Sequence, residues 1–152
     1  MFADVNVNLT FQQPRDLRRI ATAAFEGAYL RGLWDRLVAA LTGRAHGLRT
    51  LPARLAEGRF AGTQVVPVDK VRGSENRAAD FDADFHPLRA EIQERWVSVY
   101  EAIRRGKPLP PVELVQVDDT YYVRDGHHRL SVARALGMDY VDAVVIEAAL
   151  RL

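Results

Sequence analysis

Cysteine is absent from this chain of 152 residues, and its absence removes several kinds of chemistry at once. Without a thiol the chain can form no disulfide, no thiolate nucleophile and no cysteine–zinc site. No apolar run approaches the roughly 20 residues that a membrane-spanning helix needs. The first residues lack the basic-then-apolar layout of a secretory signal peptide, and no internal repeat is visible. Together these absences predict a cytoplasmic protein that makes no contact with a membrane.

An excess of one sign of charge is also lacking, since 21 basic residues stand against 20 acidic ones. The distribution is uneven, however, because residues 1–60 hold nine arginines and five acidic residues, whereas the remainder is net acidic. Such an arginine excess fits either an acidic partner such as DNA or an ordinary solvated helix face. What the chain does contain is material for a core, because 48% of its residues are hydrophobic.

Helical spacing dominates the first third of the chain. From Pro14, a residue suited to the first turn of a helix, apolar side chains recur at steps of three and four until Thr42-Gly43. Gly27 and Gly32 predict a bend or break within this helix, and residues 53–57 fit one further short helix. The apolar stripe of the long helix includes Phe25, Trp34 and Leu37. We expect this stripe to pack on the rest of the chain or on a second copy of it.

Strands alternate with helices after residue 60. The strands are expected at residues 64–68, 112–117, 121–123 and 141–146. Pro67 places the first of them at a sheet edge or ends it there, and residues 69–77 read as a polar loop. A second helix is expected to begin near Pro87, capped by carboxylates of residues 80–84, and to end at Gly106.

The resulting order is strand, polar loop, helix, hairpin, turn, helix and strand. It predicts a small α+β domain with a mixed sheet at residues 61–152. Residues 1–60 are expected to form a helical segment in front of this domain.

The stretch from Tyr121 to Gly137 is the part of the chain that is hardest to explain as core. Its Asp-Gly pair marks a turn from a strand into a helix, and Gly126 can take backbone angles that a side chain forbids. The N–H groups of the new helix are then flanked by His127, His128 and Arg129. Oriented N–H donors, the positive end of a helix and a guanidinium fork suit an anion, above all a phosphate.

Each of these side chains also has a structural alternative. Arg129 can pair with Asp125, and Asp125 can hold Mg²⁺, orient a histidine or only shape the turn. His127 and His128 could bind a metal together with Asp125. Adjacent residues diverge in direction and no third histidine lies at a ligand spacing, so hydrogen bonds to phosphate are favoured. Ser131 can bond a phosphate from the first helical turn or satisfy a local carbonyl.

Together these segments resemble the ParB/sulfiredoxin superfamily. The resemblance covers roughly residues 64–147. It is carried by Val-Pro-Val-Asp-Lys-Val at 66–71, by Pro-Pro-Val-Glu-Leu at 110–114 and by Asp-Gly-His-His-Arg at 125–129, with Gly137 beyond. It implies a compact sheet-and-helix fold whose Gly-x-x-Arg loop surrounds the phosphates of a nucleotide, here CTP, ATP or ADP with Mg²⁺.

Members of this superfamily differ between the glycine and the arginine of that loop. Partition ParB proteins, which bind CTP, typically have Glu-Arg there, and sulfiredoxins have a Cys-His-Arg version, whose sulfinic-acid chemistry a chain without cysteine excludes. The Asp-Gly-His-His-Arg form is similar to that of free-serine kinases, in which an upstream acidic residue is the base for phosphoryl transfer. The resemblance implies that role for Glu75, with Asp125 as the second catalytic candidate and Arg77 steadying charge across the cleft.

Two functions are compatible with these residues. The first is a nucleotide-binding domain whose reaction, if it is an enzyme, is kinase-like phosphoryl transfer or nucleotide hydrolysis. The alternative is a non-enzymatic, DNA-associated or regulatory module, in which the nucleotide switches a homodimer formed through the N-terminal helices.

Overall fold

The computed structural model of the chain describes residues 14–51, 58–76 and 79–149. Its elements are α1 (Pro14–Thr42), β1 (Arg49–Thr50), β2 (Arg59–Pro67), the 3₁₀ turn η1 (Val68–Lys70), β3 (Val71–Ser74), the 3₁₀ turn η2 (Ala90–Ile92), α2 (Gln93–Arg104), β4 (Val112–Val117), β5 (Thr120–Asp125), α3 (His127–Ala135) and β6 (Tyr140–Ala148). The short helix predicted at residues 53–57 lies outside the described residues, and so does Arg77. Within the described ranges, no helix combines the length and the apolar composition that crossing a membrane would take.

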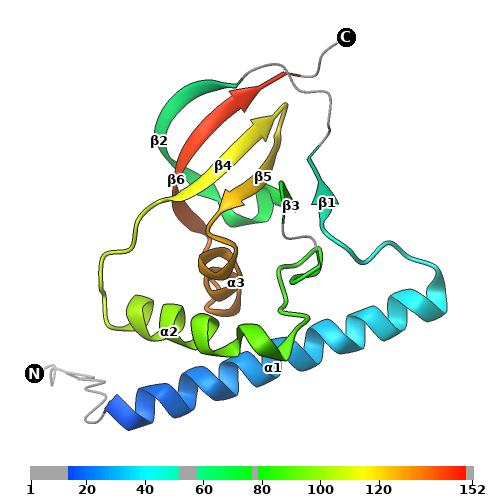
Figure 1. The fold of residues 1–152 in the computed structure, drawn as a ribbon, viewed down its shortest axis with the longest axis vertical. Helices are drawn as coiled ribbons and strands as arrows, with labels where there is room; N and C mark the ends of the chain where they lie inside the picture. The colour runs from blue at the N-terminus through cyan, green and yellow to red at the C-terminus, as the bar shows by residue number, and fades with distance from the viewer. Residues whose placement is uncertain (1–13, 52–57, 77–78, 150–152) are drawn as a thin grey trace, which may run out of the picture.

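The strands form one mixed sheet in the order β1-β3-β5-β4-β6-β2. Neighbours β1/β3, β3/β5 and β4/β6 are parallel, whereas β4/β5 and β2/β6 are antiparallel. The helix α3 lies between this sheet and α2, and α1 runs along the other side of α2 (Figure 1). The predicted α+β class with a mixed sheet is therefore confirmed.

The core lies where the three helices meet the sheet. Trp96 of α2 is fully buried at its centre, and the indole N–H donates a hydrogen bond to Ser131 Oγ at 2.8 Å. The ring of Phe25, on α1, meets the Trp96 ring edge-on with 5.6 Å between centroids. Leu114 of β4 and Leu130 of α3 are fully buried in the same cluster. The N-terminal helix is thus part of the core.

Other parts of residues 1–60 are also built into the domain. The short strand β1 pairs with β3, with Arg49 opposite Gly73. At the opposite edge of the sheet, β2 already begins at Arg59. The segment that the sequence sets apart therefore contributes a helix to the core and residues to both edges of the sheet.

The helix α1 is continuous over 29 residues, so the predicted bend or break at Gly27 and Gly32 is wrong. Gly32 serves packing instead, because a Cβ built there would lie only 3.0 Å from Pro87 O. A Cβ at Gly27 would meet nothing within 4 Å. The helix ends at Thr42, and Gly43 follows with φ 68°, as the sequence predicts.

The prediction of a polar loop at residues 69–77 is also wrong in part. The chain makes the turn η1 and then enters β3, which pairs in parallel with β5 inside the sheet. Val71 is fully buried, and a Cβ at Gly73 would lie 2.5 Å from the Tyr122 ring. Tertiary context determines this strand, because Arg72, Gly73 and Ser74 carry little intrinsic preference for a sheet.

The second helix begins later than predicted, at Gln93 after the turn η2. The carboxylates before it cap no helix. Asp82 Oδ1 instead accepts the N–H groups of Asp84 at 2.9 Å and His86 at 2.8 Å, which folds the chain there into a tight loop. The helix ends before Gly106, whose φ is 67°, as predicted.

Predictions that rest on local turn chemistry are confirmed. β4 and β5 form a hairpin around Asp118 and Asp119. β2 is an edge strand that ends at Pro67. α3 is followed by Gly137 with φ 69°. Each of these features needs only a few neighbouring residues to specify it.

Candidate functional site at the start of α3

The strand β5 passes into α3 through a single glycine. Gly126 caps the helix with φ 106° and ψ 24°, a left-handed conformation that disfavours side chains. A Cβ at this position would also lie 2.6 Å from Val112 Cγ1. Because α3 begins at His127, the N–H groups of its first turn find no acceptor within the helix and point out of its positive end. The predicted Asp-Gly turn into a helix is therefore confirmed.

Because β3 and β5 pair in parallel, Glu75 and Asp125, the two predicted catalytic carboxylates, lie at the carboxyl ends of neighbouring strands. Ser74 lies opposite Val123 in this ladder, and the N–H of the next residue, Glu75, donates to Val123 O at 2.9 Å. Ser74 Oγ in turn lies 2.6 Å from His127 Nε2. Glu75 therefore follows the last residue of β3, and Asp125 is the last residue of the neighbouring strand β5.

The two histidines of the motif are buried, with exposed fractions of 3% for His127 and 8% for His128. The Phe81 ring stacks on His127 with 6.1 Å between centroids, and it meets His128 edge-on at 5.5 Å. These ring contacts fix the first turn of α3 from the side of the core. The main-chain N–H groups of the same turn remain at the helix end.

Arg129 is held by main-chain carbonyls. Its Nη1 donates to Pro110 O and, at 3.0 Å, to Pro111 O, while its Nη2 donates to Asp125 Oδ2 at 3.0 Å. The ion-pair alternative considered for Arg129 and Asp125 is thus present in the structure. The guanidinium joins the connector before β4 to the start of α3, and a ligand that uses it must share its fork.

Glu75 makes a two-pronged ion pair with Arg124. Arg124 Nε donates to Glu75 Oε2 at 2.9 Å, and Nη2 donates to Oε1 at 3.2 Å. The hydrogen bond that Arg124 donates to this carboxylate raises the pKa of Arg124, and partial burial opposes the rise. Both oxygens of Glu75 thus accept from Arg124, and each keeps a second lone pair.

Ser131 faces the core and not the helix end. Its hydroxyl donates to Phe85 O at 2.6 Å and accepts the Trp96 N–H, and the residue is 2% exposed. Its hydrogen-bonding capacity is used there, so the structure does not bring Ser131 together with Asp125 and Glu75.

A cavity of about 190 Å³ lies in front of the first turn of α3. It is lined by Arg95, Val99, Leu109, Pro110, Asp125, Gly126, His127, His128 and Arg129. Sequence reasoning names neither Arg95, which reaches the cavity from α2, nor Arg124. No signal in the sequence points to Arg95, because α2 meets α3 only through tertiary packing. Arg124 directly precedes the motif on β5, and that position is a signal that could have identified it.

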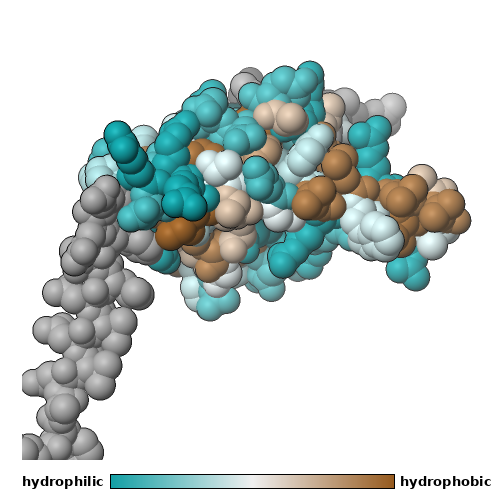
Figure 2. All heavy atoms as spheres, turned by 90° about the horizontal axis from the view of Figure 1, so that it is seen from below, coloured by the Kyte–Doolittle hydropathy of each residue, from teal (hydrophilic) through white to brown (hydrophobic). Residues whose placement is uncertain are grey.

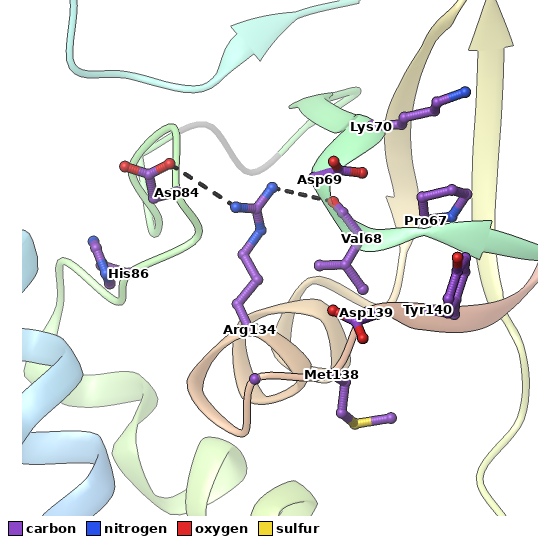
Figure 3. A pocket seen from close by; sticks show the side chains of 11 residues that line it. Pro67, Val68, Asp69, Lys70, Asp84, His86, Arg134, Met138, Asp139 and Tyr140 are labelled. Atoms are coloured by element: carbon purple, nitrogen blue, oxygen red, sulfur yellow. Dashed lines mark hydrogen bonds and ion pairs between the residues drawn. The ribbon is translucent and has the colours of Figure 1, made fainter.

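A larger cavity, about 700 Å³, lies at the other end of α3 (Figure 3). Arg134 extends into it between Asp84 and the turn η1, and its Nη2 donates to Val68 O at 3.1 Å and Val71 O at 3.2 Å. Burial lowers the pKa of Arg134, and the Asp84 carboxylate partly offsets this. Its guanidinium also lies 5.5 Å from the centre of the Phe85 ring. These contacts describe an arginine that fastens η1 to α3, and size alone does not make this cavity the functional one.

No family model matches the sequence, and no curated protein matches it. Among solved structures, the chain is similar to sulfiredoxin from Arabidopsis thaliana, with a TM-score of 0.44 and 22% identity over 57% of this chain and 86% of the sulfiredoxin. It is also similar to a conserved hypothetical protein from Pyrococcus furiosus, with a TM-score of 0.43 and 18% identity over 60% of this chain. The chain spans 35% of the length of that second protein. Both TM-scores lie below 0.5 and both identities below 25%, so neither likeness carries an inference about this chain.

Proposed function

We propose that the chain binds a nucleotide, CTP, ATP or ADP, through its phosphates at the start of α3. The observation that carries this proposal is the left-handed Gly126, which sets the first turn of α3 with its N–H groups at a cavity lined by Arg95 and Arg129. N–H groups at the positive end of a helix favour an anion. The guanidinium groups add charge-assisted hydrogen bonds, which phosphate oxygens accept well.

Asp125 supplies the group that a magnesium nucleotide needs at this place. Its side chain is 66% exposed although it pairs with Arg129, so one carboxylate oxygen can reach a ligand. Mg²⁺ is bound in proteins by one or two carboxylates together with phosphate oxygens and water. In this proposal Asp125 holds the cation, and the N–H groups of α3 hold the phosphates.

The reaction class that suits these groups is phosphoryl transfer to a hydroxyl or to water. The acceptor oxygen forms a bond to the terminal phosphorus, the bond from that phosphorus to its bridging oxygen breaks, and the acceptor proton passes to Glu75. The parallel pairing of β3 with β5, which puts Glu75 and Asp125 at the ends of neighbouring strands, supports this proposed role for Glu75. Most of the rate enhancement would come from positioning and charge neutralisation.

Thermal unfolding and calorimetry with CTP, ATP, ADP and GTP, each with Mg²⁺, test the binding. A ligand of the folded state raises the midpoint by mass action. Arg95→Ala is the sharper variant, because Arg129→Ala would also leave the carbonyls of Pro110 and Pro111 without their donor. We expect Arg95→Ala to weaken binding about fivefold, which is about 1 kcal/mol for an exposed charge contact.

Arg104→Ala is the matched control, since Arg104 is an exposed arginine of α2 that does not line the cavity. The nucleotide affinity of the Arg104→Ala variant should equal that of the unchanged chain. Equal affinities of the two variants, or no shift with any nucleotide, would contradict the proposal. Salt-sensitive binding to DNA without any response to nucleotide would favour the DNA-associated alternative.

A further inference from the structure

Three side chains that could ligate a metal, Asp35, Asp82 and His86, have ligand atoms within 4.8 Å of one another, and His46 lies next to Asp82. Asp35 comes from α1, His46 from the segment after α1, and Asp82 and His86 from the loop before α2. Two imidazoles and two carboxylates thus converge from three separate parts of the chain. Asp82 is 1% exposed, so this is no ordinary set of surface charges.

The distances among Asp35, Asp82 and His86 are close to those between the ligands of one ion. His86 Nδ1 lies 2.9 Å from Asp82 Oδ2 and 3.5 Å from Asp35 Oδ2. His46 Nε2 lies 3.9 Å from the same Asp82 oxygen. Four ligands at 2.0–2.2 Å around a tetrahedral ion are separated by about 3.4 Å. Small side-chain rotations would therefore bring Asp35, Asp82 and His86 onto one centre, and a larger rotation would add His46.

An unsatisfied buried atom points to the same place. His46 Nε2 is buried and has no hydrogen-bond partner among the described residues, which is uncommon for a buried ring nitrogen. The main chain holds this histidine in position, because the N–H of Ala83 donates to His46 O at 3.0 Å and Gly47 bridges to Asp82. The other oxygen of Asp82 is occupied by main-chain N–H groups, which leaves Oδ2 directed at the cluster.

We propose that Asp35, His46, Asp82 and His86 form a binding site for a divalent transition metal such as Zn²⁺. Imidazole nitrogen suits zinc and its neighbours, whereas Mg²⁺ and Ca²⁺ prefer sites made of oxygen alone. A cavity of about 280 Å³, lined by three of these four residues, gives an ion access from solvent. The site is independent of the proposed phosphate site.

The charge balance of the cluster fits a bound cation. Asp35 and Asp82 are like charges that face one another across His86. His86 Nδ1 lies 2.9 Å from Asp82 Oδ2 and 3.5 Å from Asp35 Oδ2, so the imidazole stands between the two carboxylates. A divalent cation bound there would offset both negative charges and would engage His46 as well.

A metal here would clamp α1 to the loop that supports the motif. Phe81 adjoins Asp82 and Phe85 adjoins His86 in this loop, and the Phe81 ring packs on His127 and His128. Cross-linking Asp82 and His86 to α1 would therefore stiffen the wall behind the first turn of α3. Metal binding contributes directly to the stability of the structure that forms the site.

The experiment uses the untagged full chain, stripped of metal with a chelator and then titrated with Zn²⁺ or Co²⁺ alone. We expect one ion per chain by elemental analysis, a higher unfolding midpoint, and the intense visible absorption of tetrahedral cobalt. Asp35→Asn and His46→Gln should each weaken binding at least about tenfold, since even the loss of an outer partner of a ligand costs that much. Both side chains are only partly buried, so these variants should fold without metal.

Glu26→Gln is the matched control, because it removes an exposed carboxylate from the same helix and should leave the affinity unchanged. His128→Gln tests the competing location at the start of α3. The proposal is overturned if neither metal binds in stoichiometric amount, if Asp35→Asn and His46→Gln bind as well as the control, or if binding is lost in His128→Gln.

Discussion

Large apolar residues recur at helical spacing in both halves of α1, but they face the core in the first half and solvent in the second. In the first half, Leu17, Ala21 and Phe25 turn inward and are buried in the core. In the second half, the large apolar side chains turn outward, and Leu30 and Trp34 are 63% and 65% exposed. Hydrophobic periodicity therefore identifies a stripe on a helix but does not tell which surface the stripe will meet.

The inward stripe continues through the second half with a different composition. Gly32, Asp35 and Ala39 occupy its positions there, and Gly32 and Ala39 are buried. Small residues let the loop before α2 approach the helix closely, and an aspartate brings charge where the first half has apolar side chains. The opposite face is left apolar, and hydrophobic residues gather where the end of α1 projects from the molecule (Figure 2).

The exposed face carries the spacing of a coiled-coil seam. Leu30, Trp34, Leu37 and Leu41 follow one another at steps of four, three and four residues. Leu37 is 51% exposed and Leu41 79%. We propose that two copies of the chain associate through this seam, whereas the first half of α1 belongs to the core of each copy.

Among the variants of α1, Phe25→Ala in the buried first half should destabilise the chain most. Its ring is 2% exposed, stacks on Tyr29 and packs against Trp96, so truncation leaves a cavity. We expect the free energy of unfolding to fall by about 3–5 kcal/mol in denaturant titrations. Leu30→Ala, in the exposed half, should change it by less than about 0.5 kcal/mol. Similar losses for the two variants would mean that the halves of α1 are packed alike.

Two glycine-to-alanine substitutions in α1 should change the stability by smaller amounts and in opposite directions. Gly27→Ala should stabilise the chain by about 0.5–1 kcal/mol, because a Cβ there meets nothing and alanine favours the helix. At Gly32 the added methyl would press on Pro87 O and on the side chains of His86 and Leu88. We expect Gly32→Ala to lose about 1 kcal/mol overall, because overpacking exceeds the gain in helix propensity. Thermal unfolding of both variants in parallel would show the opposite signs, and a stabilised Gly32→Ala would refute close packing at this point.

The double substitution Trp34→Lys with Leu37→Lys should have the smallest effect on the fold and the clearest effect on assembly. Both side chains lie on the exposed face, so the free energy of unfolding of a single chain should stay within about 0.5 kcal/mol. Light scattering should show a dimer for the unchanged chain and a monomer for the variant. Arg36→Ala, an exposed change on the same helix, should leave the molar mass unaltered. A monomeric unchanged chain would contradict the proposed seam.

Local chemistry explains which parts of the fold could be predicted. The hairpin around Asp118 and the helix between Gly126 and Gly137 depend on neighbouring residues, and the sequence specifies both. The strand β3 was missed because its stability comes from pairing with β5 about 50 residues away and from the fit of Gly73 under Tyr122. The break wrongly expected in α1 has the same origin, since Gly32 is explained by Pro87 and not by the helix itself.

The candidate site follows the same rule. The turn at Gly126 could be predicted, because it follows from a short local motif. The position of Glu75 next to β5 depends on the pairing of β3, which was not predicted, and the partners of the side chains could not be predicted either. Glu75 pairs with Arg124, Arg129 bonds two carbonyls before β4, and the Asp35–His86 cluster joins residues that are distant in sequence. Phosphate contact by Arg129 stays a prediction.

The bulge in β2 bears on how this molecule behaves when it is concentrated. β2 is an edge strand of nine residues, and Phe60 and Val65 on it are 69% and 65% exposed. Long apolar edges of this kind invite the strand of another molecule to add on, which leads to fibres. Between Phe60 and Gly62 the register shifts, with Gly62 at φ 89°, and Pro67 removes a donor at the far end. An incoming strand would thus find only a short straight stretch to match, and the irregular edge protects the chain from open-ended aggregation.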